Sequence, residues 1–234
     1  MLTPKEIELY SRHFLIEGFT HEHQDRLKRG SALVIGAGGL GTPVLLYLAG
    51  AGIGRLGIVE YDSVEISNLN RQFAYTRDDL GRPKTEIIGE KIKSVSSECV
   101  INLYNEKWAA ARAESIAKEF NILIDCSDNY ASRYLSDSIS IKLQIPMIYG
   151  AVHQMEGQMA VFNYKGSRSY SELFPNTINQ ASTEAVGVLG PLAGIIGSLQ
   201  ATEALKILAN FGTVLVNKLF VISLKHNRTQ YIDF

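Results

Sequence analysis

The stretch LVIGAGGLG, from Leu33 to Gly41, decides the fold class of this chain. The apolar residues before its first glycine are typical of a buried strand, and the apolar run GTPVLLYLAGAGI (41–53) is typical of a helix that covers a sheet. Gly36, Gly38 and Gly41 satisfy G-x-G-x-x-G between the two elements, where a tight turn brings the backbone close to phosphate oxygens. The stretch therefore predicts a nucleotide-binding α/β fold.

Strands and helices alternate beyond this loop. Further strands are expected at 55–62, 100–106, 121–128 and 145–152, and helices between them at 83–95, about 111–119 and 129–143. This alternation predicts a Rossmann-like, doubly wound and mostly parallel sheet with helices on both faces. After residue 152 the pattern changes, and we expect antiparallel strands at 157–164, 218–224 and 228–234 with a helix at 188–209.

The chain is predicted to be a single domain over residues 1–234, with nucleotide-binding βα units at 31–152. Residues 1–30 precede these units, and an amphipathic helical pattern covers 3–29. Residues 165–185 are polar and lack a helical period, so we expect a long surface loop that is functional or mobile.

Composition bounds the function. A net charge of −1 over 234 residues gives no electrostatic argument for nucleic acid. Only two cysteines occur, Cys99 and Cys126, and a buried free thiol is expected at Cys126, as suits a reducing compartment. The N-terminus lacks a signal-peptide core, and the most apolar run, GVLGPLAGIIGSLQATEALKIL, is interrupted by polar residues. We therefore expect a cytoplasmic protein with no membrane partner.

The glycines do not distinguish ATP from a dinucleotide. Glu60 and Asp62 end the second strand, where an acidic residue holds ribose hydroxyls in both kinds of site. The alternative to a nucleotide site is that the glycine turn at 36–41 is needed only for packing.

The segment DSVEISNLNRQF (62–73) favours ATP. It places neutral and cationic donors close together, with Lys84 shortly after: Ser67, Asn68, Asn70, Arg71 and Gln72. Such donors hold a triphosphate and neutralise charge as phosphorus is attacked. The alternatives are that Ser67 or Asn68 caps a helix, and that Arg71 and Lys84 are ordinary surface charges.

Asp128 follows the apolar strand in IDCSDN (124–129), at the sheet edge where ligands of open α/β folds bind. A carboxylate there suits Mg²⁺, whose shell water and phosphate oxygens complete. The alternative is that Asp128 caps the helix that starts near Asn129. Asp125 precedes Cys126 on the strand and is less suited to be a ligand.

With these residues assembled, the chain resembles the ThiF/MoeB/HesA family, bacterial relatives of ubiquitin-activating enzymes. Seven motifs follow in the family's order over nearly the whole chain: YSRHF, GAGGLG, YDSVEISNLNRQ, GRPK, DCSDN, MEGQMAVF and GPLAGIIGSLQATEALK. The resemblance implies that ATP and Mg²⁺ bind together with the Gly-Gly tail of a small ubiquitin-fold sulfur carrier of the ThiS or MoaD type. The tail carboxylate then attacks the α-phosphorus, pyrophosphate leaves, and the acyl-adenylate later receives sulfur for thiamin or molybdopterin synthesis.

The resemblance also implies roles for single residues. The nucleotide turn is lined by Gly36, Gly38, Gly39 and Gly41. Asp62 would hold the ribose, and Asp128 would hold Mg²⁺. Ser67 lies in the nucleotide segment, where Asn68, Arg71 and Lys84 would contact the phosphates. Arg12 matches an arginine that reaches into the neighbouring subunit's site, which implies a homodimer. The helix at 188–209 and MEGQMAVF resemble the family's interface region, so the resemblance implies that 153–234 is the carrier-binding and dimer region, with 165–185 as its crossover loop.

The chain departs from the family at two places. Most relatives carry zinc on two C-x-x-C pairs, but the first pair's positions hold Ser169 and Glu172 here, and the sequence ends at Phe234, where the second pair would follow. We therefore expect no zinc, and a loop 165–185 without its staple. Thr183 occupies the position of a cysteine found in many relatives, so the chain is expected to stop at the adenylate and to depend on a separate sulfur donor.

Three other functions remain open from the sequence. They are an adenylating enzyme for another carboxylate or a tRNA base, a non-catalytic module that binds the carrier, and an NAD(P)-dependent oxidoreductase.

Overall fold

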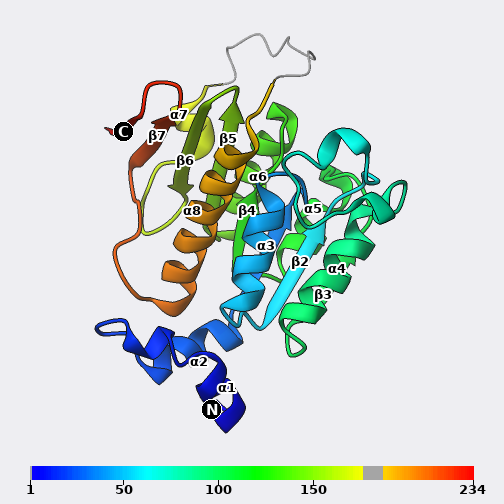
Figure 1. Ribbon diagram of the computed structural model, residues 1–234. Helices are drawn as coiled ribbons and strands as arrows, with labels where there is room; N and C mark the ends of the chain where they lie inside the picture. Colours follow the sequence, from blue (N-terminus) through cyan, green and yellow to red (C-terminus); the bar gives the residue numbers. More distant parts are fainter. Residues whose placement is uncertain (1, 176–186) are drawn as a thin grey trace.

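The computed structural model describes residues 2–175 and 187–234, which build one sheet of eight strands in the order β3-β2-β1-β4-β5-β6-β7-β8 (Figure 1). The strands are β1 (Ser31–Ile35), β2 (Arg55–Val59), β3 (Val100–Tyr104), β4 (Ile122–Asp125), β5 (Met147–His153), β6 (Glu156–Phe162), β7 (Lys218–Ser223) and β8 (Arg228–Asp233). The strands β1 to β5 pair in parallel, and β6, β7 and β8 are added antiparallel. The predicted doubly wound α/β fold is confirmed.

The strand order reverses at β1, which lies between β2 and β4. Ile35 is in register with Val59 of β2 and with Asp125 of β4, so these three strands end at one level of the sheet. In open α/β sheets ligands bind beyond the carboxyl ends of the strands at such a switch point. The topology therefore places the glycine loop, the residues after β2 and the residues after β4 side by side.

Helices cover both faces of the sheet, because successive side chains of the fully buried strand β1 point to opposite faces. Ala32 and Val34 pack under α3 (Gly41–Gly50), α4 (Lys84–Val95) and α8 (Gly190–Ala209). Leu33 and Ile35 pack on the other face, under α5 (Ala110–Ala117) and α6 (Tyr130–Leu143). Because both faces are buried, the strands read as apolar runs rather than as alternating patterns.

Helix α8 corrects one expectation. By length and composition it is long and apolar enough to cross a membrane, although the interrupted sequence suggested otherwise. Half of its most apolar window is buried, and the helix packs against α3 and β5 (Figure 1). Its hydrophobicity is that of a core helix, with one side left on the surface.

The predicted helix at 3–29 is broken. The chain forms α1 (Pro4–Leu9), a 3₁₀ turn (His13–Leu15) and α2 (His21–Arg29), separated by Gly18 with φ +79°. The Tyr10 ring lies against Gly52, just beyond the C-terminus of α3. The N-terminal arm therefore lies at the amino ends of the strands, opposite the glycine loop (Figure 1).

Part of the predicted loop 165–185 is ordered structure. Residues 170–173 form the helical turn α7 (Tyr170–Leu173), while 176–186, including Thr183, lie outside the described residues. Ser169 and Glu172, at the positions of the missing cysteines, form a reciprocal capping box with N···O distances of 3.3 and 2.7 Å. The buried Asp137 carboxylate accepts the Tyr170 N–H at 2.8 Å. The expectation of a loop throughout 165–185 is therefore wrong for 170–173, where capping holds a helical turn.

Candidate nucleotide and adenylation site

The glycine loop requires glycine at two positions. Gly36 has φ +95° and its N–H donates to the Val59 carbonyl at 2.8 Å. A Cβ on Gly41 would overlap the Gly36 carbonyl oxygen, so the loop can close only around a glycine there. The N–H groups of Gly38 and Gly39 donate to no group in the part of the chain that the structure describes. They lie at the N-terminus of α3, where anions bind.

Glu60 is excluded as a ribose ligand because the loop uses its carboxylate. This buried side chain accepts the N–H groups of Ala37 at 2.9 Å, Tyr61 at 2.7 Å and Asp62 at 2.9 Å. The Tyr75 hydroxyl donates to the Ala37 carbonyl at 2.7 Å, and burial raises its pKa, so it stays a donor. Glu60 and Tyr75 therefore fix the loop, and Asp62 is the acid left at the surface.

Lys84 is not a surface charge. Its side chain is only 4% exposed, at the start of α4, and its Nζ lies 3.3 Å from Oδ2 of Asp62. The backbone reinforces this contact, because the Lys84 N–H donates to the Asp62 carbonyl at 3.0 Å. The predicted ribose and phosphate residues are thus brought together as one buried cation beside one exposed carboxylate.

The segment after β2 folds into a compact turn around a 3₁₀ helix (Ile66–Asn68). Asn68 is buried and its Oδ1 accepts the Glu65 N–H at 3.1 Å, as the third residue of a capping box whose N-cap is Glu65 and not Ser67 or Asn68. Its Nδ2 donates to none of the described residues and remains available for a phosphate. The Ser67 hydroxyl is exposed and donates to Glu65 at 3.3 Å, which directs it to its own turn.

Arg71 lies beside Gly39 of the glycine loop. Its Nη1 donates to the Ser67 carbonyl at 2.8 Å and to Asn70 Oδ1 at 3.1 Å. A Cβ on Gly39 would lie 3.6 Å from Arg71 Cγ, so the side chain runs beside the predicted phosphate site. Unlike a free surface charge, this guanidinium is held in place before any ligand binds.

Gln72 belongs to the site more closely than the sequence indicated. It is 4% exposed, its amide lies next to Gly38, and its Oε1 has no hydrogen-bond partner among the described residues. Its place in a run of donors was the available signal. Only the structure shows a buried polar group at the loop.

Asp128 lies just beyond β4 and is exposed. The N-cap of α6 is Asn129, whose Oδ1 accepts the Ser132 N–H at 2.8 Å, so the capping alternative for Asp128 is wrong. The pKa of Tyr61 is raised by the charge of Asp62, by burial and by the charge of Asp128. Two carboxylates therefore act on the same tyrosine across the switch point, and the uncommitted oxygens of Asp128 fit a hard divalent cation.

Two further residues lie away from this site. Arg12 is exposed on the N-terminal arm and forms no ion pair with a described residue. The thiol of Cys126 is buried and donates to Gln200 Oε1 at 3.7 Å, and burial raises its pKa well above the usual value. Cys126 is therefore unsuited to be a nucleophile.

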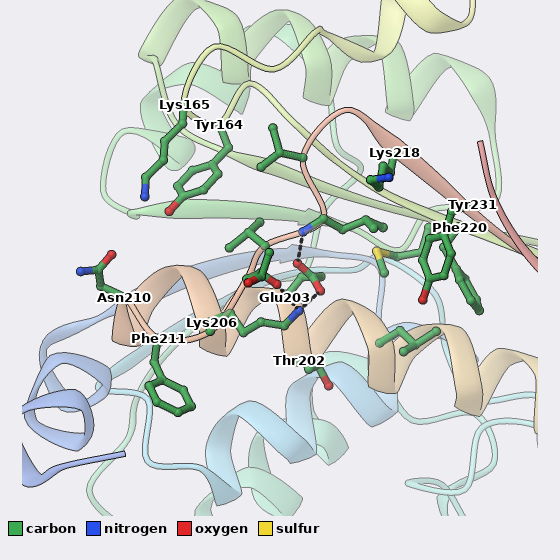
Figure 2. A pocket seen from close by; sticks show the side chains of 17 residues that line it. Tyr164, Lys165, Thr202, Glu203, Lys206, Asn210, Phe211, Lys218, Phe220 and Tyr231 are labelled. Carbon is green, nitrogen blue, oxygen red and sulfur yellow. Dashed lines mark hydrogen bonds and ion pairs between the residues drawn. The ribbon is translucent and has the colours of Figure 1, made fainter. Parts of the chain in front are cut away.

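A separate hollow of about 900 Å³ lies between the C-terminal half of α8 and the antiparallel strands (Figure 2). Glu203 pairs with Lys206 at its floor and accepts the Leu215 N–H at 2.9 Å. Lys206 also donates to the Thr213 carbonyl at 2.8 Å. These charges hold the α8–β7 connection, and the hollow does not include the glycine loop.

Comparison with known proteins identifies the family. The ThiF family model matches residues 10–234. The chain is 41% identical over 227 residues to a probable molybdopterin-synthase adenylyltransferase of Porphyra purpurea, covering 95% of this chain and 58% of that protein. It is 37% identical over 227 residues to the sulfur carrier protein adenylyltransferase of Thermus thermophilus, covering 94% of this chain and 84% of that protein.

Solved structures share the fold. The crystal structure of PaaA superposes with a TM-score of 0.86 at 24% identity, over 100% of this chain and 84% of that one. The crystal structure of Escherichia coli MccB with ATP gives 0.84 at 21% identity, over 96% and 71%. At these identities the likeness concerns the fold alone. On the family match and the two relatives, the chain belongs to the ThiF family.

Proposed function

We propose that this protein is an adenylyltransferase that activates the C-terminal Gly-Gly carboxylate of a small ubiquitin-fold sulfur carrier of the MoaD or ThiS type. The observation that carries the proposal is the grouping of Arg71, Lys84, Asp62 and Asp128 around the glycine loop at one sheet edge. The names of the relatives at about 40% identity, for molybdopterin synthase and for a sulfur carrier, support the substrate class. The chain spans only 58% of the Porphyra protein, so its own activity and substrate remain proposals.

The reaction needs alignment and positive charge rather than a protein nucleophile. The free N–H groups at the start of α3, Asn68 Nδ2, Arg71 and Lys84 hold the triphosphate, and Asp62 holds the ribose. The tail carboxylate oxygen attacks the α-phosphorus, the bond to the bridging oxygen breaks, and pyrophosphate carries away the electron pair. Mg²⁺ suits Asp128 and would neutralise phosphate charge when bound.

We further propose a homodimer in which Arg12 serves the neighbouring subunit. The arm that carries Arg12 lies at the amino ends of the strands, opposite its own glycine loop (Figure 1). The outer face of α8 is apolar, with Ile195 and Leu199 lining a hollow beside Tyr47 of α3. Such a face suits the interface that this arrangement needs.

The remaining expectations belong to the same proposal. The protein is cytoplasmic and one adenylation domain, it holds no zinc, and a separate protein donates sulfur to the adenylate. Ser169 and Glu172 support the absence of zinc at the first pair's positions, because each is engaged in capping α7.

ATP–pyrophosphate exchange with Mg²⁺ tests the function, using purified small carriers that end in Gly-Gly. We expect exchange that requires the carrier and is lost when its last glycine is removed. Nucleotide binding without exchange for any carrier would contradict the proposal and favour a carrier-binding module or another carboxylate substrate.

A further inference from the structure

The position of Asp128 is set by its neighbours rather than by its own contacts. Its side chain is exposed, and its one hydrogen bond among the described residues is long, 3.5 Å from Asn129 Nδ2. A carboxylate that must meet a cation at fixed geometry therefore depends on the backbone of its turn.

Ser127, the residue before Asp128, is held on both sides. Its N–H and its hydroxyl donate to Oδ1 of the fully buried Asp125, at 3.1 and 2.6 Å. Its carbonyl accepts a hydrogen bond from Arg133 Nη2 at 3.2 Å. That carbonyl belongs to the peptide that joins Ser127 to Asp128, so Arg133 fixes the plane from which the Asp128 side chain projects.

Arg133 is itself rigid and charged. It lies one turn into α6 and is 9% exposed, with its guanidinium 5.4 Å from the Tyr130 ring centre and 5.5 Å from that of Tyr149. Burial disfavours its charge, but Tyr149 and Asp125 outweigh this, so the pKa of Arg133 is raised. A guanidinium between two rings loses little further freedom when it donates a hydrogen bond.

This arrangement is poor as a stabilising device. Oδ2 of Asp125 and Nε of Arg133 are both buried without a hydrogen-bond partner among the described residues. Such groups cost stability, and apolar side chains at both 125 and 133 would avoid the penalty. The arginine is therefore better explained by what it does to the neighbouring turn.

We propose that Arg133 is a positioning residue that orients Asp128 toward the divalent cation through the Ser127 carbonyl, an inference that rests on the adenylating function proposed above. Residues that orient a metal ligand change metal affinity or activity by about 10- to 100-fold when they are replaced. Lysine at this position would keep the charge but lose the planar fork and its stacking.

The test measures how much Mn²⁺ tightens the binding of a non-hydrolysable α,β-methylene analogue of ATP. Affinity is measured by calorimetry with and without Mn²⁺, and the ratio reports the metal site independently of turnover. We expect Asp128→Ala to remove most of this ratio and Arg133→Lys to lower it about tenfold, with the metal-free affinity unchanged. In the Asp128→Ala background, Arg133→Lys should have no further effect.

Lys142→Gln is the matched control. It removes a cation from the same helix, and this cation pairs with Glu114, away from the Asp128 turn. Ser127→Ala tests the same turn if Arg133→Lys fails to fold, and it should lower the ratio as well. A wild-type ratio in a folded Arg133→Lys variant would overturn the proposal, as would a loss of metal-free affinity, which would make Arg133 a nucleotide contact. Normal Mn²⁺-dependent binding without pyrophosphate exchange would refute only the proposed function.

Discussion

At the residue scale, ligand candidates differ from structural residues in whether hydrogen bonds within the fold already occupy their polar atoms. Glu60 and Asp62 are two residues apart, but Glu60 is buried under three N–H donors while Asp62 faces solvent beside Lys84. Asp128 and Asn129 are adjacent, but Asn129 caps α6 and leaves the carboxylate uncommitted. A polar group that the fold has already satisfied has little left to offer a substrate.

Replacing Asp128 by Asn should abolish carrier-dependent pyrophosphate exchange, by at least about 100-fold, because a charge aimed at the cation is lost. Thermal unfolding should stay unchanged, since the side chain is exposed and, within residues 2–175 and 187–234, bonds only to Asn129. Asp78→Asn, an exposed acid on another turn, is the control and should keep full activity. Exchange near the wild-type rate in Asp128→Asn would show that the carboxylate does not serve the reaction.

Replacing Arg71 by Ala should raise the transition-state barrier by about 2–4 kcal/mol, as for the loss of one preorganised donor. The guanidinium is held beside the loop by Ser67 and Asn70, so it loses less freedom when ATP binds than an unheld side chain would. Exchange rates at saturating and limiting ATP give the value, with Arg77→Ala, an exposed arginine, as the control. An unchanged kcat/KM for ATP would remove Arg71 from the site.

At the element scale, short helical turns depend on their capping. Helix α7 has four residues, too few to be stable alone. Asp137 of α6 accepts the N–H groups of Tyr170 at 2.8 Å and Ser171 at 3.1 Å, and Ser169 and Glu172 cap the same end. Charge-assisted capping thus holds this short helix in place.

Asp137→Ala should lower the free energy of unfolding by about 2–3 kcal/mol, because buried N–H groups lose their acceptor. Urea titration measures this, and Ser138→Ala, an exposed neighbour on α6, should change it little. A zinc chelator should leave the melting temperature of the wild type unchanged. A lower melting temperature with chelator, or stoichiometric zinc by elemental analysis, would contradict capping as the substitute.

The contribution of the N-terminal arm to folding stability should depend on pH. Its Glu6 pKa is lowered from 4.5 to about 2, first by a hydrogen bond from Lys28 and then by the Thr3 N–H. Because the folded-state pKa is the lower one, this stabilisation is complete above pH 4.5 and is lost as the pH falls toward 2. The melting temperatures of wild type and Glu6→Gln should therefore differ at pH 6 and converge near pH 2. A constant difference would show that Glu6 acts through packing.

At the scale of the whole molecule, one chain separates residues that the proposed reaction needs together. The glycine loop and Asp128 lie at the carboxyl ends of the strands, while Arg12 lies on an arm packed at the amino ends (Figure 1). In the proposed homodimer, a second copy would supply Arg12 to the site of its neighbour.

Mixing two inactive variants tests this arrangement. Arg12→Ala and Asp128→Ala should each be inactive alone, and equal mixing should restore about a quarter of wild-type exchange, because half of the dimers contain one intact site. Light scattering establishes the dimer. The control is a mixture of Asp128→Ala with Arg71→Ala. If one chain supplies both Asp128 and Arg71 to a site and the other supplies Arg12, this mixture should recover no activity. That control fails if Arg71 and Asp128 belong to different chains. No recovery in the Arg12 mixture of exchangeable dimers would place Arg12 outside the neighbouring site.

The sequence predicts the location of the candidate site because its residues follow strand ends. Apolar runs interrupted by glycine or by Asp128 mark the carboxyl edge of a parallel sheet, and that edge brings 36–41, 62–72 and 128 together. What could not be read is which polar groups become buried. Lys84 is predicted as a phosphate contact, but its sequence neighbours do not indicate that it is buried, and the same holds for Gln72 and Arg133.

The sequence by itself determined the sheet, its order of elements and the family, because periodicity, the glycine loop and motif order are local properties of the chain. Only the tertiary structure decided that Glu60 holds the loop while Asp62 stays free, that Asn129 rather than Asp128 caps α6, and that Asp137 holds α7. The physical reason is that burial and hydrogen-bond partnership depend on atoms distant in sequence. The three-dimensional packing, not the residue type, decides which polar group forms its hydrogen bonds within the fold and which remains free to bind a ligand.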